Sequence, residues 1–401
     1  MHLTVALVTA LALSSPAGSD AAVRQYRGDI AGALQAAEAV LASSPEDPVA
    51  RLVAASAAIE LGDLRRADAL LTPLERGPAP SPRATVLRHL VTQRRRPSPG
   101  PLMQDLAIAW AAAGRPDLSE ADPDVAHASQ APLPALPASA SLTSAERLLI
   151  APPQGARDQR ALAVASAANA SQNVLVANLQ VLGLLGMQPC PPDPMEQRKA
   201  VAAAMEAAVR AVPENGYVIV AGWIAGCPNR IDATNVAILT NAAARPEFRY
   251  PRERAFREIA AVTERVDIPA ARARAISAWL ALDIPLWRLV ALAESVEDPA
   301  TRRAAGLAIA AIGFRMADGD AWLERLQGVT LAQKGAGLSE DENAIARACE
   351  RANAERGGYR EWADANRLMG SWSFAAEWRE WTPDEVNASR RFLKDVSRDG
   401  R

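Results

Sequence analysis

The chain has 401 residues, of which 49% are hydrophobic and 22% are charged, so it is long enough for more than one domain and apolar enough to bury a core. This composition excludes a chain that is disordered throughout. The formal net charge of -2 gives no field that would attract nucleic acid or an anionic membrane, so we predict no nucleic-acid partner.

An uncharged apolar run, residues 3–13, opens the chain and is followed by the break Ser14-Ser15-Pro16 and by small residues. This order is typical of a secretory signal peptide, so we predict a cleaved signal at residues 1–21 and a periplasmic or secreted protein. The alternative is an ordinary N-terminal helix of a cytoplasmic protein, because no Lys or Arg precedes the run. No later segment reaches the roughly 18 uninterrupted apolar residues of a membrane-spanning helix, so we predict no such segment in the mature chain.

Two Gly-Asp pairs, Gly28-Asp29 and Gly62-Asp63, lie 34 residues apart, each between two helical stretches. Small residues such as Ala67 follow where a second helix must approach its partner. A period of 34 residues is that of the tetratricopeptide repeat, a helix-turn-helix unit that stacks into solenoids. Residues 22–117 therefore resemble a tetratricopeptide repeat (TPR) domain.

A third and looser copy runs from Ala109-Trp110 to a turn at Gly114, 52 residues after Gly62. The extra length predicts an inserted loop over residues 76–101. This loop contains the basic cluster Arg94-Arg95-Arg96, which has Pro and Ser around it but no aromatic residue. We therefore interpret the cluster as a solvated loop and not as a nucleic-acid site.

The resemblance implies a surface that holds a protein or peptide partner and carries no chemistry of its own. Family members that grip acidic peptide ends use Lys and Asn on the first helix of each repeat. Residues 49–61 contain Arg51 and neither of those residue types. This particular peptide clamp is therefore not expected here.

Repeated Pro, Ala and Ser in residues 118–143 predict a semi-extended linker between two domains. The capping box Thr143-Ser144-Ala145-Glu146 then predicts the start of a helix. Further helix starts are predicted where a capping side chain precedes a Pro or an acidic residue, namely at Asp193-Pro194, Asp298-Pro299, Ser339 with Glu342, and Thr382-Pro383.

A second internal repeat links Phe256-Arg257 to Trp287-Arg288, 31 residues later. One such period is the length of a helical hairpin, so residues 144–401 are predicted to be a helical-repeat domain resembling an α-solenoid. We therefore predict that the chain is all-α, with TPR-like and then α-solenoid-like hairpins in a right-handed superhelical stack.

Motifs that carry chemistry are scarce. The three histidines, His2, His89 and His127, do not suggest a metal site, and no nucleophile elbow, zinc-protease motif or phosphate loop is present. We therefore predict no catalytic residue, no metal site and no cofactor. Glu294-Ser295 and Gly186-Met187-Gln188 are similar, in reversed order, to pieces of lytic transglycosylases. A glycan-active envelope enzyme is thus an alternative, and it requires two facing carboxyl groups, one with a raised pKa.

Two cysteines, Cys190 and Cys227, each follow a predicted helix and precede a Pro, with one helix between them. In an up-down-up stack the ends of the first and third helices lie on the same side, so we predict a Cys190–Cys227 disulfide in an oxidising compartment. Two buried thiols are the alternative. Cys349 lies within a predicted helix and is expected in the core.

Aromatic residues gather near the C-terminus, at Tyr359, Trp362, Trp372, Phe374, Trp378 and Trp381. Such a cluster is consistent with a cap that closes the last repeat and also with a partner-binding surface. Trp378 and Trp381 share one helix face. These two residues and Trp372 are the candidates for binding.

Taken together, these patterns predict a non-catalytic interaction or scaffold protein of the bacterial cell envelope. The many Ala, Pro and Arg residues are typical of a GC-rich genome. A glycan-active enzyme and a cytoplasmic TPR adaptor are the alternatives.

Overall fold

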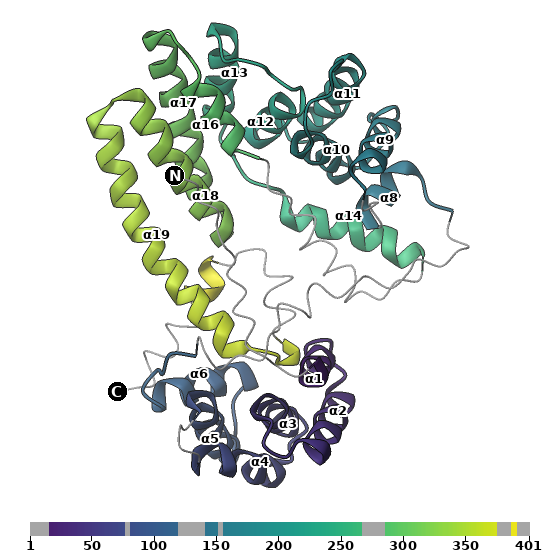
Figure 1. Ribbon diagram of the computed structural model, residues 1–401, viewed down its shortest axis with the longest axis vertical. Coiled ribbons are helices and arrows are strands. Elements are labelled where there is room, and N and C mark those ends of the chain that lie inside the picture. Colours follow the sequence, from purple (N-terminus) through teal and green to yellow (C-terminus); the bar gives the residue numbers. More distant parts are fainter. Residues whose placement is uncertain are drawn as a thin grey trace. The chain divides into compact units, whose positions relative to one another are not determined.

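The computed structural model describes residues 16–76, 81–118, 141–150, 155–266, 285–374 and 386–390. Within these ranges the regular elements are α-helices, together with one isolated bridge between Asn215 and Glu247 (Figure 1). The predicted all-α fold is therefore confirmed. No helix in the described ranges is long and apolar enough to cross a membrane.

The chain divides into two compact units. Unit 1 comprises Met1–Pro132, Arg360–Thr382 and Asn387–Arg401, and unit 2 comprises Leu133–Tyr359 and Pro383–Val386. The predicted second domain includes residues 360–374, whereas the structure groups these residues with the N-terminal helices. The predicted linker falls largely outside the described residues.

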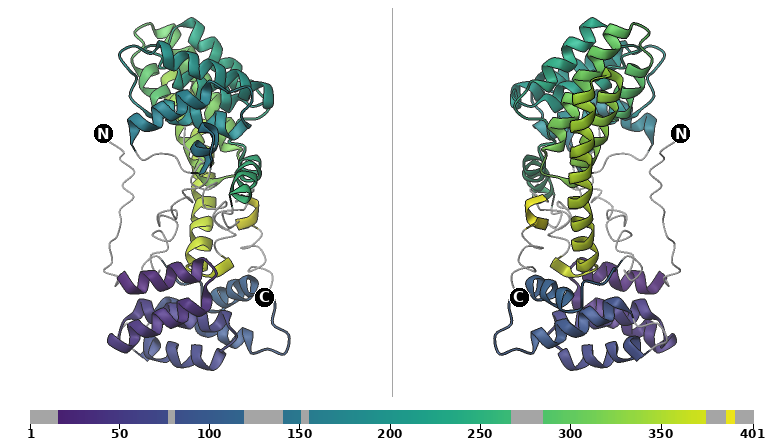
Figure 2. Two further views of the ribbon diagram at one scale, coloured as in Figure 1. Left: turned by 90° about the vertical axis from the view of Figure 1, so that its right-hand side faces the viewer. Right: turned by 90° about the vertical axis from the view of Figure 1, so that its left-hand side faces the viewer.

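Unit 1 is built from stacked helical hairpins. Its N-terminal helices are α1 (Pro16–Tyr26), α2 (Ile30–Ser43), α3 (Pro48–Glu60), α4 (Leu64–Arg76), α5 (Pro82–Arg94) and α6 (Leu102–Ala112). Consecutive helices pack against each other, and α3 also packs against α1 and α5. Figure 2 shows these helices, coloured purple to blue, lying side by side. Helices α1, α3 and α5 thus form one layer, which we call the first-helix layer.

The turns that predicted the repeat share one backbone geometry. Gly28, Gly62 and Gly114 have φ values of 85°, 79° and 83°. In each turn the N–H of the next residue donates to a carbonyl five positions earlier, as from Asp63 to Ala58 at 2.8 Å. This is the Schellman ending, which requires a left-handed residue and therefore favours glycine.

The acidic residues of both Gly-Asp pairs cap the helices that follow. The carboxylates of Asp29 and Asp63 accept hydrogen bonds from backbone N–H groups three residues later, each at 3.0 Å. Each Gly-Asp pair thus ends one helix and starts the next.

Most of the predicted helix starts in unit 2 are confirmed. The N–H of Thr143 donates to the Glu146 carboxylate at 2.8 Å, and the N–H of Glu146 donates to the Thr143 hydroxyl at 3.2 Å, so the capping box is formed. Asp298 caps its helix through the N–H of Thr301 at 2.8 Å, and Asp193 accepts from the N–H of Met195 at 3.0 Å.

The helix start predicted at Ser339 with Glu342 is present, since α19 begins at Glu342, but Ser339 is not its cap and instead ends α18. Asp341 caps the next helix through the N–H groups of Asn343 and Ala344. Thr382 and Pro383 lie outside the described residues.

The predicted inserted loop over residues 76–101 is also wrong, because Pro82–Arg94 forms α5. The Ser81 hydroxyl accepts from the N–H of Ala84 at 3.4 Å, and Pro82 occupies the first helical position, where its missing N–H is not needed. The proline that suggested a loop is therefore a helix-start signal.

The interpretation of Arg94-Arg95-Arg96 as a solvated cluster holds for Arg95 and Arg96, which are exposed, whereas Arg94 is half-buried. Arg94 pairs with Asp105 at 2.8 Å, and Arg95 pairs with Asp68. Arg94 and Arg95 thus tie α5 to its neighbours α6 and α4.

Unit 2 contains a central helix with others packed around it. Its described helices are α8 (Ser144–Ile150), α9 (Ala156–Ala167), α10 (Leu175–Met187), α11 (Met195–Ala211), α12 (Gly216–Ala225), α13 (Ala233–Ala243), α14 (Arg252–Arg265), α16 (Trp287–Glu294), α17 (Pro299–Ala317), α18 (Trp322–Ser339) and the first part of α19 (Glu342–Met369). Residues 175–186 of α10 are all buried, and this helix packs against α8, α9, α11, α12 and α14.

The second predicted repeat is described only in part, because residues 267–284 lie outside the described ranges. Helix α14 packs against α8 and α10, whereas α16 packs against α17 and α18. The two copies of the 31-residue pattern thus begin helices with different neighbours.

A disulfide joins Cys190 and Cys227, as predicted. Cys190 follows the end of α10 and Cys227 follows the end of α12, and their Cα atoms are 5.7 Å apart, within the usual range for a disulfide. The prediction for Cys349 is wrong, because its side chain is exposed on α19.

Replacing Gly62 with Ala is expected to lower the free energy of unfolding by about 1–2 kcal/mol, the cost of placing a side chain in left-handed backbone. A Cβ atom on Gly62 has nothing within 4 Å, so strain of the backbone is the whole effect. Gly337, inside α18, also has open space around it and serves as the control. Gly337→Ala should raise stability by roughly 0.5–1 kcal/mol. Urea unfolding followed by circular dichroism measures both, and effects of the same sign would contradict the assignment.

Reduction of the Cys190–Cys227 disulfide is expected to lower the free energy of unfolding by about 3–4 kcal/mol in the chain-entropy model, since the cysteines are 37 residues apart. Thermal unfolding with and without a reductant measures the loss. The double variant Cys190→Ala, Cys227→Ala should be insensitive to the reductant. Denatured, unreduced protein should show one reactive thiol, that of Cys349, and three would rule the bond out.

Candidate interaction site

Of the three predicted aromatic binding residues, only Trp372 lies within the described residues. Trp372 has 0% of its surface exposed and lies in the core of unit 1, so its prediction as a ligand-binding side chain is corrected to a core residue. Its ring stacks on that of Phe374 with centroids 5.7 Å apart. Trp378 and Trp381 lie outside the described residues, and their binding role stays a prediction.

Trp372 belongs to a stretch that we call the C-terminal segment, residues 365–374. Its buried apolar residues share one cluster with side chains of α3 and α5, including Leu52, Ile59 and Leu87. The cluster members from the segment are Ala365, Leu368, Met369 and Trp372. The segment therefore packs on the first-helix layer of unit 1.

A buried glutamine joins the segment to two helices of the layer. Gln25 of α1 is fully buried, and its amide oxygen accepts hydrogen bonds from the hydroxyls of Ser56 at 2.9 Å and Ser371 at 3.1 Å. Its amide nitrogen donates to the carboxylate of Glu60 at 2.7 Å. Because hydroxyl donors meet the oxygen and a carboxylate meets the nitrogen, the network fixes the orientation of the amide.

Glu60, the last residue of α3, binds the segment directly. Its carboxylate accepts from the backbone N–H of Ser373 at 3.1 Å and also from the Ser373 hydroxyl. Burial raises the pKa of Glu60, and the hydrogen bonds from Ser373 and Gln25 oppose this shift without cancelling it. The recorded hydrogen-bond donors to Glu60 are thus all neutral groups.

Arg83 of α5 holds the end of α19. Its side chain donates to the carbonyls of Arg367 at 2.8 Å and Leu368 at 3.4 Å. The end of a helix leaves such carbonyls without intrahelical partners and carries partial negative charge. Gly370 has a φ of 49°, and a Cβ atom there would collide with the Arg83 guanidinium. A glycine is therefore required for the turn and for the arginine.

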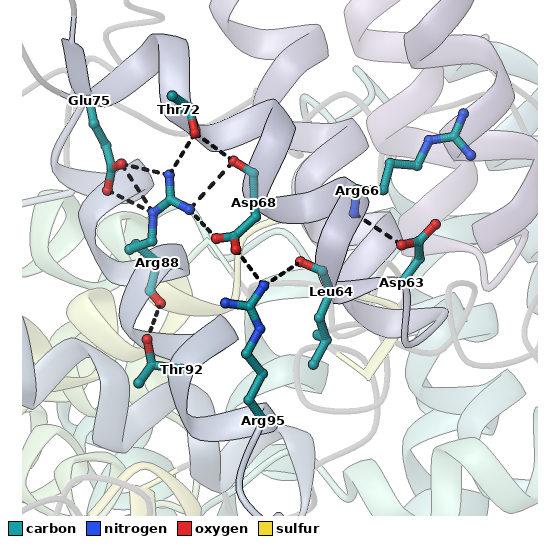
Figure 3. Close-up of polar contacts among 9 residues, drawn as sticks. All are labelled: Asp63, Leu64, Arg66, Asp68, Thr72, Glu75, Arg88, Thr92 and Arg95. Atoms are coloured by element: carbon teal, nitrogen blue, oxygen red, sulfur yellow. Dashed lines mark hydrogen bonds and ion pairs between the residues drawn. The ribbon is translucent and has the colours of Figure 1, made fainter.

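A second polar cluster fixes the helix that carries Arg83. Figure 3 shows Arg88 of α5 reaching Asp68, Thr72 and Glu75 of α4. Its Nε lies 3.1 and 3.2 Å from the two carboxylate oxygens of Glu75. Arg95 binds Asp68 from the next turn of α5. The cluster thus neutralises its own charges and clamps α5 to α4.

The pKa values of Glu60 and Asp68 are shifted in opposite directions. Partial burial by itself raises the pKa of Asp68, but the hydrogen bond from Arg95 and the charge of Arg88 outweigh it and lower the pKa. Glu60 has no such cation among its described partners. The Asp68 cluster is structural, whereas Glu60 marks the site at which the segment binds.

The sequence analysis missed Gln25, Glu60 and Arg83. Each of them forms hydrogen bonds with residues that are distant in sequence, and no local pattern predicts such partners. The available signal was a charged residue at the boundary of an apolar helix, since Glu60 ends α3 and Arg83 lies in the first turn of α5. Gln25, Glu60 and Arg83, which bind the segment, come from α1, α3 and α5, the three helices of the first-helix layer.

A family model for the tetratricopeptide repeat matches residues 26–84. The match covers α2, α3 and α4 with both Gly-Asp turns, so the N-terminal part of the chain is a TPR-like helical repeat, as the spacing of those turns predicted. No curated protein and no solved structure matches the chain. The right-handed superhelix stays a prediction.

Replacing Glu60 with Ala should lower the free energy of unfolding by roughly 2–4 kcal/mol, because the buried donors of Gln25 and Ser373 lose their acceptor. Glu60→Gln keeps an acceptor and removes the ionisation. Because the folded-state pKa is raised, the folded protein binds more protons, and wild-type stability should fall as pH rises from about 4.5 through the folded pKa.

Urea unfolding at several pH values between 4 and 7 measures this dependence. The stability of the wild type relative to Glu60→Gln should decrease across this range. The contribution of Asp68, which has the opposite sign, is common to both proteins and cancels. Parallel curves for the two proteins would contradict the shift.

Proposed function

We propose that the chain is a non-catalytic protein-interaction or scaffold protein of the bacterial cell envelope, and that its first-helix layer is a polypeptide-binding surface. The observation that carries the proposal is the C-terminal segment. The layer receives a helix end followed by Ser371-Trp372-Ser373-Phe374 through apolar burial and hydrogen bonds. The segment is a resident ligand of this surface.

The contacts define what the layer recognises. Arg83 donates to the carbonyls at a helix end, and the Gln25 and Glu60 pair accepts from two hydroxyls and a backbone N–H. The cluster around Leu87 packs against apolar side chains. These groups bind backbone and side chains of a polypeptide and provide no nucleophile or proton relay. TPR-like hairpins with such a face support an interaction role.

The alternative of a glycan-active enzyme has one supporting observation. Burial raises the pKa of Asp364, and the charge of Asp117 adds to the increase. However, Arg367 lies 3.4 Å from Asp364 and 4.0 Å from Asp117, so a cation pairs with both acids. Asp117 is 76% exposed, which does not suit a carboxyl pair enclosing a sugar. We therefore keep the non-catalytic proposal.

Two features support the proposed envelope location. The Cys190–Cys227 disulfide suits an oxidising compartment, and residues 3–13 have the length of a signal-peptide core. The candidate cleavage segment, residues 17–21, lies within α1, and Ala21 and Ala22 are fully buried. Cleavage after residue 21, as predicted, removes the fully buried Ala21, so N-terminal sequencing of the envelope fraction tests both this location and the position of the cut.

Binding in trans tests the polypeptide-binding surface. In the full-length variant Trp372→Ala, Phe374→Ala the resident segment is weakened. A labelled peptide of residues 360–376 should then bind this variant, as measured by fluorescence anisotropy, and should bind wild type at least tenfold more weakly because its own segment occupies the layer. Adding Glu60→Ala to the variant should reduce peptide binding about tenfold, the equivalent of one lost charge-assisted hydrogen bond.

The control for this experiment is Glu38→Ala in the same variant, since Glu38 lies on α2 outside the first-helix layer. Equal effects of the two Glu substitutions, or no peptide binding by a variant whose circular dichroism is unchanged, would contradict the proposal.

A further inference from the structure

Two arginines of unit 2 converge on the loop that carries Cys190. Arg160 of α9 donates to the amide oxygen of Gln188 at 3.0 Å and to the carbonyl of Pro189 at 2.6 Å. Arg288 of α16 donates to the carbonyl of Gly186 and to the Cys190 sulfur, both at 2.9 Å. The end of α10 is thus surrounded by guanidinium groups from two other helices.

A third arginine lies at the other half of the disulfide. Arg198 of α11 is exposed and donates to the carbonyl of Gly226, next to Cys227, at 3.3 Å. Within the described residues, the recorded partners of Arg160, Arg198 and Arg288 are all uncharged. Burial also lowers the pKa of Arg288, as expected for a cation without a compensating anion.

Two buried glutamines beside the disulfide each keep an unused polar atom. Gln188 is 7% exposed and Gln197 is 3% exposed. Arg160 fixes the oxygen of Gln188, so its Nε2 is a donor without a partner among the described residues. Gln197 donates through Nε2 to the carbonyl of Ala225 at 2.8 Å, which leaves its Oε1 as an acceptor without a partner there. Both atoms are fully buried, so they lie beneath the surface and out of reach of a docked partner.

Three exposed large apolar residues lie close in sequence to these polar residues. Met187 is 45% exposed, Met195 is 63% exposed and Trp287 is 70% exposed. Met187 precedes Gln188, and Trp287 precedes Arg288. Exposed Trp and Met next to Arg is the composition of a protein–protein interface core.

The acidic residues nearby have local roles. Asp193 accepts the N–H of Met195, and Glu196 lies in the first turn of α11, where both offset the positive end of the helix dipole. Neither is recorded as an ion-pair partner of the arginines in the described residues.

We propose that this disulfide-end surface, formed by Arg160, Met187, Met195, Arg198, Trp287 and Arg288, binds an acidic segment of a partner protein that also carries a large apolar side chain. Carboxylates pair with the guanidinium groups. The apolar side chain packs on Trp287 and the methionines.

The disulfide preorganises this surface. It joins the ends of α10 and α12, so the carbonyls that orient Arg160, Arg198 and Arg288 keep their relative positions. A surface that is already ordered loses less conformational entropy on binding. The site is in unit 2 and is independent of the first-helix layer.

A peptide-display selection on the oxidised full-length protein tests the proposal. A random 12-residue peptide library is first incubated with the double variant Arg198→Glu, Trp287→Ser, and the peptides that bind it are discarded because they bind elsewhere on the protein. The remaining peptides are then selected for binding to wild type. The selected peptides should be enriched in Asp or Glu together with Phe, Leu or Trp. Each should bind wild type about tenfold more tightly than Arg198→Glu at low salt, and this difference should shrink as salt screens the charges.

Matched controls separate the surface from general charge. Arg210→Glu changes an exposed arginine on the same helix as Arg198, and Leu307→Ser changes an exposed apolar residue of α17. Both controls should leave binding unchanged. Because the side chains of Arg198 and Trp287 are exposed, their variants should keep the wild-type melting temperature, which circular dichroism verifies.

Three results would overturn the proposal. The first is selection of peptides without acidic enrichment, or of none. The second is an equal loss of binding in Arg198→Glu and Arg210→Glu. The third is binding to vesicles of phosphatidylglycerol with the same dependence on Arg198 and Trp287, which would assign the surface to an anionic membrane.

Discussion

Unit 1 depends on closure of its first-helix layer by residues from the far end of the chain. Residues 52–59 of α3 are all buried, and a helix that is apolar all round requires neighbours on every side. Helices α1, α4 and α5 provide part of this cover, and the C-terminal segment adds Leu368, Met369 and Trp372. The bond from Arg83 to Arg367 spans 284 positions in the sequence. During synthesis the N-terminal hairpins therefore expose apolar surface until the last part of the chain arrives, a period in which aggregation competes with folding.

The polar contacts at this closure select one arrangement among many apolar ones. Apolar packing alone tolerates shifts of a segment, whereas the buried amide of Gln25 requires hydroxyls on one side and a carboxylate on the other. Glu60 supplies that carboxyl group without a cation among its described partners, and burial raises its pKa. Asp68 has two arginine partners and a lowered pKa. The same unit thus combines a carboxylate that specifies the segment with one that stabilises the scaffold.

Features set by neighbours in sequence could be predicted, and features set by distant partners could not. The Gly62-Asp63 turn and the Thr143 capping box involve atoms within five residues, so sequence spacing determines them. The Cys190–Cys227 bond followed from the up-down-up order of three helices. By contrast, the aromatic cluster that contains Trp372 is consistent with either a binding surface or a core. The contact of Trp372 with the first-helix layer shows that it is a core residue. Arg83 is a buried charged residue, and its partners are carbonyls at the end of α19. No local sequence pattern predicts these partners.

The buried segment also limits how a partner can use the TPR-like layer. Full burial of a large apolar side chain is worth roughly 1.5–3 kcal/mol, so displacing Leu368, Met369 and Trp372 together costs about 5–9 kcal/mol before any hydrogen bond is counted. A free energy of that size corresponds to the whole affinity of a millimolar to micromolar complex. Only a partner that buries a similar apolar area and forms hydrogen bonds with Gln25, Glu60 and Arg83 can replace the segment. The disulfide-end surface of unit 2 requires no such displacement, because its methionines and tryptophan are already exposed. It is therefore the surface on which a partner can dock without first breaking a folded contact.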